Sequence, residues 1–155
     1  MLFRSNKLLN LNDAEVLNIW KIIKETSNKS LDKNFDLLGH KFDYWYGESD
    51  VNDLIEPMIN DLKKDNKIIE DSGAFISAEE TVPKILITKS DGSYLYITTD
   101  LATVLYRQEN LPYSKALYVV DNRQSLHFDQ LFKCIKFFGF NNLEHEHIEI
   151  GRAHV

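Results

Sequence analysis

Residues 116–139 read ALYVVDNRQSLHFDQLFKCIKFFG, and this segment indicates the fold class because a strand pattern passes directly into a helix pattern. Its first part, the continuous apolar run at residues 116–120, is typical of a strand that is covered on both faces. Ser125 then predicts the cap of a helix that ends at Gly139. The side chains expected on the inner face of this helix recur at helical spacing: Phe128, Leu131, Phe132, Ile135 and Phe138.

A similar passage from strand to helix is expected at residues 94–107, YLYITTDLATVLYR. Residues 84–88 and 94–98 are rich in β-branched and aromatic side chains, and Asp91-Gly92 between them predicts an antiparallel hairpin. A further strand is expected at residues 145–148, so the order is strand, helix, strand, helix, strand. This alternation predicts an α/β fold with a parallel sheet.

The N-terminal half has helical spacing instead. Asn12 and Glu15 resemble a capping box for a helix that ends near Thr26, with Val16, Trp20 and Ile23 on one face. A short second helix is expected to stop at Gly39, with Leu31, Phe35 and Leu38 inward. A third is expected to begin at Asp50, with Pro57 perturbing it and with Leu54, Met58 and Leu62 inward.

A change of pattern near Ser72-Gly73 suggests a boundary between the two halves. We therefore expect a helical segment at residues 1–72 and the α/β part at residues 73–155.

Composition limits the classes of protein to consider. The 155 residues include 18 Lys and Arg against 24 Asp and Glu, and a net charge of -6 argues against a protein that coats nucleic acid. The only cysteine, Cys134, excludes an internal disulfide and is expected at a buried helix position in a reducing compartment. No apolar run approaches the roughly 20 residues that span a bilayer, and no secretory signal is recognised. We expect a cytoplasmic protein with no membrane contact.

Ligands of parallel sheets bind outside the carboxyl ends of the strands, which directs attention to residues 96–100 and 121–127. Asp100 would either cap a helix or bind a ligand. Tyr96 would share a strand face with Thr98, either in packing or at the ligand site. Gln124, in a connection between strand and helix, would either contact a ligand or be solvated.

The beginning of the second helix offers two more candidates. His127 and Gln130 lie on one helix face, where the free amides could receive an anion or a nucleotide, although a solvated edge is the alternative. His145 and His147 would share a strand face, but nothing in the sequence completes a metal site around them. The absence of a glycine-rich phosphate loop disfavours a P-loop or a dinucleotide site.

Four segments in order resemble the catalytic domain of the arginyl-tRNA synthetases: residues 42–53 (FDYWYGESDVND), 71–74, 89–107 and 118–132. The resemblance covers roughly residues 12–149 and implies a class I synthetase. Such a protein has a Rossmann-like domain, of which this chain would hold the second half, with residues 1–72 inserted in it or flanking it. It would activate arginine with ATP and Mg²⁺ and transfer it to tRNA(Arg).

The resemblance also implies roles for individual residues. Tyr96, Asp100 and Gln124 match the positions that bind arginine, and His127 and Gln130 match a His-x-x-Gln motif on the ATP side. A carboxylate at Asp100 suits the substrate, because a guanidinium offers two parallel hydrogen bonds that a lysine ammonium cannot reproduce.

Three departures from the family pattern matter for the function. No His-x-Gly-His motif, Lys-Met-Ser-Lys loop or anticodon-binding domain is present, so the chain is expected to be an internal fragment without activity of its own. The alternative is a non-catalytic module that binds arginine, a nucleotide or a protein partner. The tips, residues 1–5 and 150–155, can be encoded by a sequencing adapter and its reverse complement, and we expect no function there, including at Gly151, Arg152 and His154.

Overall fold

A computed structural model describes residues 13–78, 84–140 and 143–151 of the chain. The chain divides into two compact units, Met1–Trp45 and Tyr46–Val155. In the described ranges, no helix is long and apolar enough to cross a membrane.

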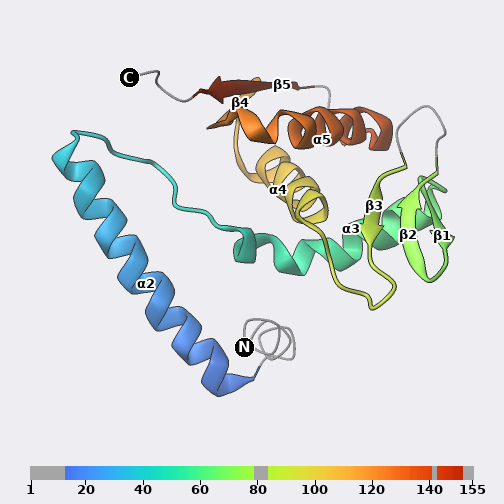
Figure 1. Cartoon of the computed structure of the whole chain (residues 1–155), viewed down its shortest axis with the longest axis horizontal. Coiled ribbons are helices and arrows are strands. Elements are labelled where there is room, and N and C mark those ends of the chain that lie inside the picture. The colour runs from blue at the N-terminus through green and yellow to red at the C-terminus, as the bar shows by residue number, and fades with distance from the viewer. Residues whose placement is uncertain (1–12, 79–83, 141–142, 152–155) are drawn as a thin grey trace. The chain divides into compact units, whose positions relative to one another are not determined.

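The first unit is built on one long helix, α2 (Ala14–Leu37), drawn in blue in Figure 1. Asp13 caps it by accepting hydrogen bonds from the amides of Glu15 and Val16, whereas the predicted cap Asn12 lies outside the described residues. The predicted break near Thr26 is wrong. The Thr26 hydroxyl donates to the Ile22 carbonyl within the helix, and residues 27–37 contain no Gly or Pro that would end it.

The end of α2 confirms the predicted stop, because Gly39 has a φ of +72° just after the C-cap Leu38. The inner face predicted for this helix is only partly present. Val16 and Trp20 are half-buried, but Ile23 is 59% exposed, so its expected inward position is wrong for the described residues.

The second unit begins with a short 3₁₀ turn, η1 (Glu48–Val51), which leads into α3 (Asn52–Lys64). Pro57 lies inside α3 without ending it. The inward face is confirmed at Met58 and Leu62, which are buried together with Ile55 and Ile59, while Leu54 is partly buried.

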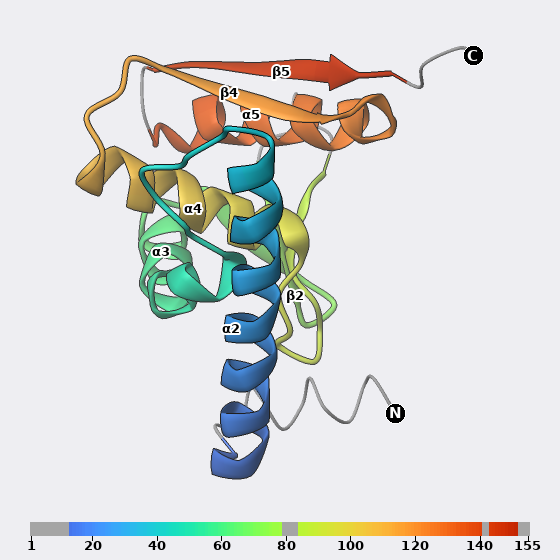
Figure 2. The ribbon, with the colours of Figure 1, turned by 90° about the vertical axis from the view of Figure 1, so that its left-hand side faces the viewer.

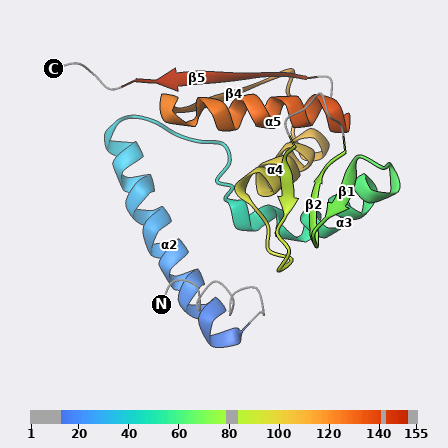
Figure 3. The same ribbon diagram turned by 45° about the vertical axis from the view of Figure 1, so that its right-hand side comes forward.

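A three-stranded antiparallel sheet follows, with strand order β1-β2-β3 (Figure 3). Its strands are β1 (Ile68–Asp71), β2 (Ala74–Ser77) and β3 (Leu86–Thr88). Ser72 and Gly73 connect β1 to β2 with φ values of +53° and +80°, the left-handed pair that a two-residue type I′ hairpin requires. The predicted boundary between the two halves of the sequence therefore lies in a tight turn, after a strand that was not predicted.

The hairpin predicted between residues 84–88 and 94–98 is wrong. The Lys89 amide donates to the Ser93 carbonyl around Gly92, but the pairing then stops at a single bridge between Thr88 and Tyr94. Helix α4 (Tyr96–Asn110) begins two residues later. Its periodic residues Ile97, Leu101 and Val104 are buried, so packing overrides the β propensity of the YLYIT run.

The C-terminal part confirms the predicted parallel pairing. Strands β4 (Lys115–Asp121) and β5 (Glu144–Ile150) are parallel, with Val119 opposite Ile148. The predicted order of strand, helix, strand, helix, strand is confirmed from α4 to β5, but its first strand, at residues 94–98, is wrong, because α4 begins at Tyr96. The strand that precedes α4 is β3, which belongs to the antiparallel sheet.

Helix α5 (Ser125–Phe138) joins the two parallel strands, after a 3₁₀ turn, η2 (Asn122–Gln124). Its inner face is confirmed: Phe128, Leu131, Ile135 and Phe138 are buried, and Phe132 is partly buried. Gly139 ends the helix as predicted, with a φ of +74°. The predicted cap is wrong by one residue, because Gln124 holds the N-cap position and Ser125 is the first helical residue.

Helix α5 lies against one face of the β4–β5 sheet, and α4 packs against α5 on that side (Figures 1 and 2). The expectation that the apolar strand is covered on both faces is wrong for the described residues, since Leu117 is 56% and Val119 60% exposed. Cys134 of α5 is completely buried, as predicted, and this burial raises the pKa of its thiol to about 12.

Candidate functional site

The closest contact among the candidate residues joins α4 to α5. His127 Nε2 lies 2.7 Å from Asp100 Oδ2, although the two residues are 27 positions apart in the sequence. The Asp100 side chain is 37% exposed and that of His127 is 27% exposed, so the pair is accessible from solvent but not freely solvated. An aspartate and a histidine at this distance form a charge-assisted or ion-paired hydrogen bond.

Asp100 does not cap α4, contrary to the capping alternative. It is the fifth residue of the helix, and the N-cap position belongs to Leu95. Instead, helix packing holds Asp100 in place, because the next two residues, Leu101 and Ala102, are completely buried. The carboxylate is thus fixed to a rigid element and faces His127.

Tyr96 lies on the same helix as Asp100, whereas a strand was predicted at this position. It is the first residue of α4 and not a strand residue, so the predicted strand face shared with Thr98 is wrong. Thr98 is buried and donates its hydroxyl hydrogen bond to the Ile87 carbonyl. Tyr96 and Asp100 are four residues apart, which places them on one side of the helix, and the Tyr96 side chain is 76% exposed.

The two glutamines lie at the beginning of α5. Gln124 is exposed at the N-cap position, three residues before His127, and Gln130 is half-buried three residues after it. In the part of the chain that the structure describes, neither glutamine side chain makes a hydrogen bond to Asp100, His127 or Tyr96. The structure therefore joins Asp100 and His127 directly and brings the other three candidates to the beginnings of the same two helices.

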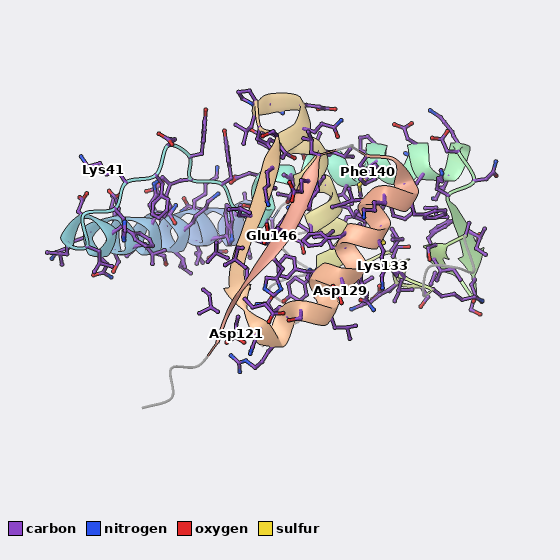
Figure 4. The ribbon with its side chains drawn as sticks, turned by 90° about the horizontal axis from the view of Figure 1, so that it is seen from above. Lys41, Asp121, Asp129, Lys133, Phe140 and Glu146 are labelled. Atoms are coloured by element: carbon purple, nitrogen blue, oxygen red, sulfur yellow. The ribbon has the colours of Figure 1, made fainter. Side chains whose placement is uncertain are left out.

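Several hydrogen bonds hold the carboxyl end of β4 in place. Figure 4 shows Asp121 at this end, where the chain leaves the strand towards α5. Asp121 accepts two hydrogen bonds from the Arg123 guanidinium, at 2.9 and 3.0 Å, and one from its amide. These bonds hold the pKa of the Asp121 carboxyl below its usual value. Ser125 Oγ donates to Glu149 Oε1, which connects the beginning of α5 to β5.

His145 and His147 face the helices from β5 and are occupied by hydrogen bonds. Tyr118 Oη lies 3.2 Å from His145 Nδ1, and His147 Nε2 lies 3.1 Å from the Val120 carbonyl. Burial lowers the pKa of His145. Within residues 13–78, 84–140 and 143–151, no three His, Cys, Asp or Glu side chains are grouped so that they could hold a metal ion.

Sequence reasoning missed two of these contacts. The Asp100–His127 and Tyr118–His145 pairs each link residues 27 positions apart on different elements. Only the assembled α/β unit brings them together, so no local pattern could have predicted them.

Residues 4–153 match the family described as tRNA synthetases class I (R), catalytic domain. The chain belongs to this family. Curated relatives agree with this assignment. An arginine–tRNA ligase of Alkaliphilus metalliredigens is 41% identical over 144 residues, which are 91% of this chain and 25% of the relative. An arginine–tRNA ligase of Halothermothrix orenii is 40% identical over 136 residues, or 86% of this chain and 24% of the relative.

Solved structures of the class I synthetase family share the fold. The arginyl-tRNA synthetase of Plasmodium falciparum superposes with a TM-score of 0.83 at 28% identity, covering 95% of this chain and 27% of that one. A Campylobacter jejuni structure titled as a putative arginyl-tRNA synthetase has a TM-score of 0.77 at 17% identity, which supports the fold alone. This chain therefore spans about a quarter of the length of the curated relatives that it matches.

Proposed function

We propose that the complete protein is an arginine–tRNA ligase and that Tyr46–Val155 supplies part of its arginine pocket. The observation that carries the proposal is the 41% identity to an arginine–tRNA ligase over 144 residues. The complete protein would bind ATP with Mg²⁺, activate arginine and transfer it to tRNA(Arg). Residues 73–155 would form the second half of its catalytic domain, residues 1–72 a helical segment within or beside it, and the isolated chain would be inactive.

Asp100 is the proposed acceptor for the guanidinium of arginine. Its carboxylate has about four lone-pair sites, and the contact to His127 uses one of them. A planar guanidinium can donate two parallel bonds to the remaining sites, whereas a lysine ammonium offers only a point charge. Tyr96, one helical turn away, and Gln124, at the beginning of α5, would complete the polar contacts to arginine.

ATP is proposed to bind on the side of α5 that carries His127 and Gln130. The beginning of α5 is the positive end of its helix dipole and favours a negatively charged group, which fits a nucleotide phosphate, while the amide of its first residue, Ser125, donates to the Asn122 carbonyl. Mg²⁺ would accompany those phosphates, as is usual for a cation that keeps several waters. His127 already contacts Asp100, so its contribution on the nucleotide side would come from the remaining ring atoms.

The substitution Asp100→Asn in the complete enzyme tests the arginine assignment. Asparagine keeps the size of the side chain but replaces one acceptor oxygen by a donor, so it loses a charge-assisted bond and repels the guanidinium. Each such bond contributes about 1.5 to 3 kcal/mol, and both parallel bonds to the guanidinium lose the carboxylate charge, so we expect kcat/KM for arginine to fall by about 10² to 10⁴ in aminoacylation assays. Asp129→Asn, a matched change at an exposed position of α5, should leave it unchanged.

Unchanged arginine kinetics in Asp100→Asn would remove Asp100 from the pocket. The alternative, a module that binds arginine, a nucleotide or a protein without catalysis, is tested at the level of the gene. Sequencing outward from residues 6–149 in the source DNA should reveal a His-x-Gly-His motif upstream and a helical domain downstream. A frame with stops at both ends would favour the non-catalytic module.

A further inference from the structure

The Asp100–His127 contact links two residues that are proposed to bind different substrates. Asp100 was assigned to arginine and His127 to ATP, yet the His127 Nε2 atom lies 2.7 Å from Asp100 Oδ2. An ionised carboxylate can only accept hydrogen bonds, so the proton of this contact must be on Nε2. The bond therefore fixes the protonation of the imidazole at this nitrogen and the orientation of the carboxylate together.

Both partners of the contact are held by well-packed helices. Asp100 is followed in α4 by the completely buried Leu101 and Ala102. His127 precedes the buried Phe128, and the two rings make an edge contact with centroids 5.3 Å apart at 77°. A donor that is held this firmly can select one orientation of a partly exposed carboxylate, which would otherwise rotate in solvent.

We propose that His127 is a positioning residue of the arginine site, which holds the Asp100 carboxylate in the orientation that receives the guanidinium. This inference rests on the proposed function and deepens it. His127 donates from Nε2 to Oδ2 and leaves both lone pairs of Oδ1 and the second lone pair of Oδ2 for the substrate. Its main effect then falls on arginine binding, and its contribution on the nucleotide side is the smaller of the two. Misplacing a binding group by removing its supporting contact costs about 10-fold to 100-fold.

Two substitutions of His127 in the complete enzyme separate this role from a structural one. His127→Phe keeps a ring but removes the donor, and His127→Gln places an amide donor near the former Nε2 position. Aminoacylation kinetics should show an arginine KM about 10-fold to 100-fold higher in His127→Phe, with the ATP KM within about twofold of the original. His127→Gln should recover most of the loss, because it restores the hydrogen bond.

A double-mutant cycle with Asp100→Asn makes the proposal specific. If His127 acts through Asp100, adding His127→Phe to Asp100→Asn should change the arginine KM little beyond the effect of Asp100→Asn alone. Lys133→Gln, at an exposed position of the same helix, serves as the control for general effects on α5. Thermal melting of every variant checks that the protein remains folded.

The outcomes distinguish this inference from the proposed function. A raised ATP KM with an unchanged arginine KM would return His127 to the nucleotide side and overturn the inference. So would equal losses in His127→Phe and His127→Gln, or additive effects in the cycle. If Asp100→Asn lowers arginine use while His127→Phe does not, the arginine site stands and only the positioning role fails. If Asp100→Asn has no effect, the proposed arginine site itself fails.

Discussion

The two faces of the β4–β5 sheet carry similar apolar residues in very different surroundings. Tyr118 points to the inner face, where its ring centroid lies 5.1 Å from that of Phe128 and 5.4 Å from that of Phe132 in α5. Its neighbour Leu117 points to the outer face and is 56% exposed. Since successive side chains of a strand alternate between faces, one apolar run provides both surfaces. A continuous apolar run therefore predicts the strand but does not predict which elements cover its two faces.

The largest expected difference between the faces concerns stability. Tyr118→Ala removes a ring packed between α5 and β5, and we expect it to lower the free energy of unfolding by about 3 kcal/mol. Leu117→Ala on the outer face should change it by less than about 1 kcal/mol. Urea unfolding followed by circular dichroism measures both. Equal losses in the two variants would mean that the outer face is covered as well as the inner one.

The stability that the inner face contributes should fall at alkaline pH. Burial raises the pKa of Tyr118 to about 12, above the value of about 10 for an exposed tyrosine. Between these values the unfolded chain loses the phenolic proton while the folded chain keeps it. The resulting stability is therefore fully present below pH 10 and is lost as the pH rises towards 12, by about 2 kcal/mol over the window.

Tyr118→Phe provides the matched comparison, because it keeps the ring and cannot ionise. The difference in unfolding free energy between the original chain and this variant should be constant from pH 7 to 9. It should then move in favour of the variant between pH 10 and 11. A constant difference over the whole range would show that the Tyr118 hydroxyl is solvated and not enclosed by the helices.

The parts of the fold that the sequence predicts well have local periodicity and a local stop. Helix α5 has inward residues at helical spacing and Gly139 in the left-handed conformation at its end, so its extent follows from the pattern. The prediction fails at residues 94–98, where the β-rich letters YLYIT begin a helix. There the burial of Ile97 and Leu101 decides the outcome, and that burial depends on the other elements of the unit.

The candidate site divides in a similar way. The family motifs identify five candidate residues: Tyr96, Asp100, Gln124, His127 and Gln130. In the structure, all five lie near the beginnings of α4 and α5. The bond between Asp100 and His127 could not be predicted, because it depends on how the two helices pack. A motif can predict which ligand each residue binds, but the contacts between these residues depend on how the helices pack.

The smallest expected effect is the most direct test of the outer face. Val119→Thr replaces a methyl group by a hydroxyl at a position that is 60% exposed, so the new hydroxyl stays hydrated. We expect the free energy of unfolding to change by less than about 0.5 kcal/mol. Val120→Thr makes the same chemical change on the half-buried inner face, where the hydroxyl must leave water, and should cost about 1 to 2 kcal/mol. If both variants lose the same stability in urea unfolding, the two faces have the same environment. Different exposure to solvent would then not account for different stability losses in Leu117→Ala and Tyr118→Ala.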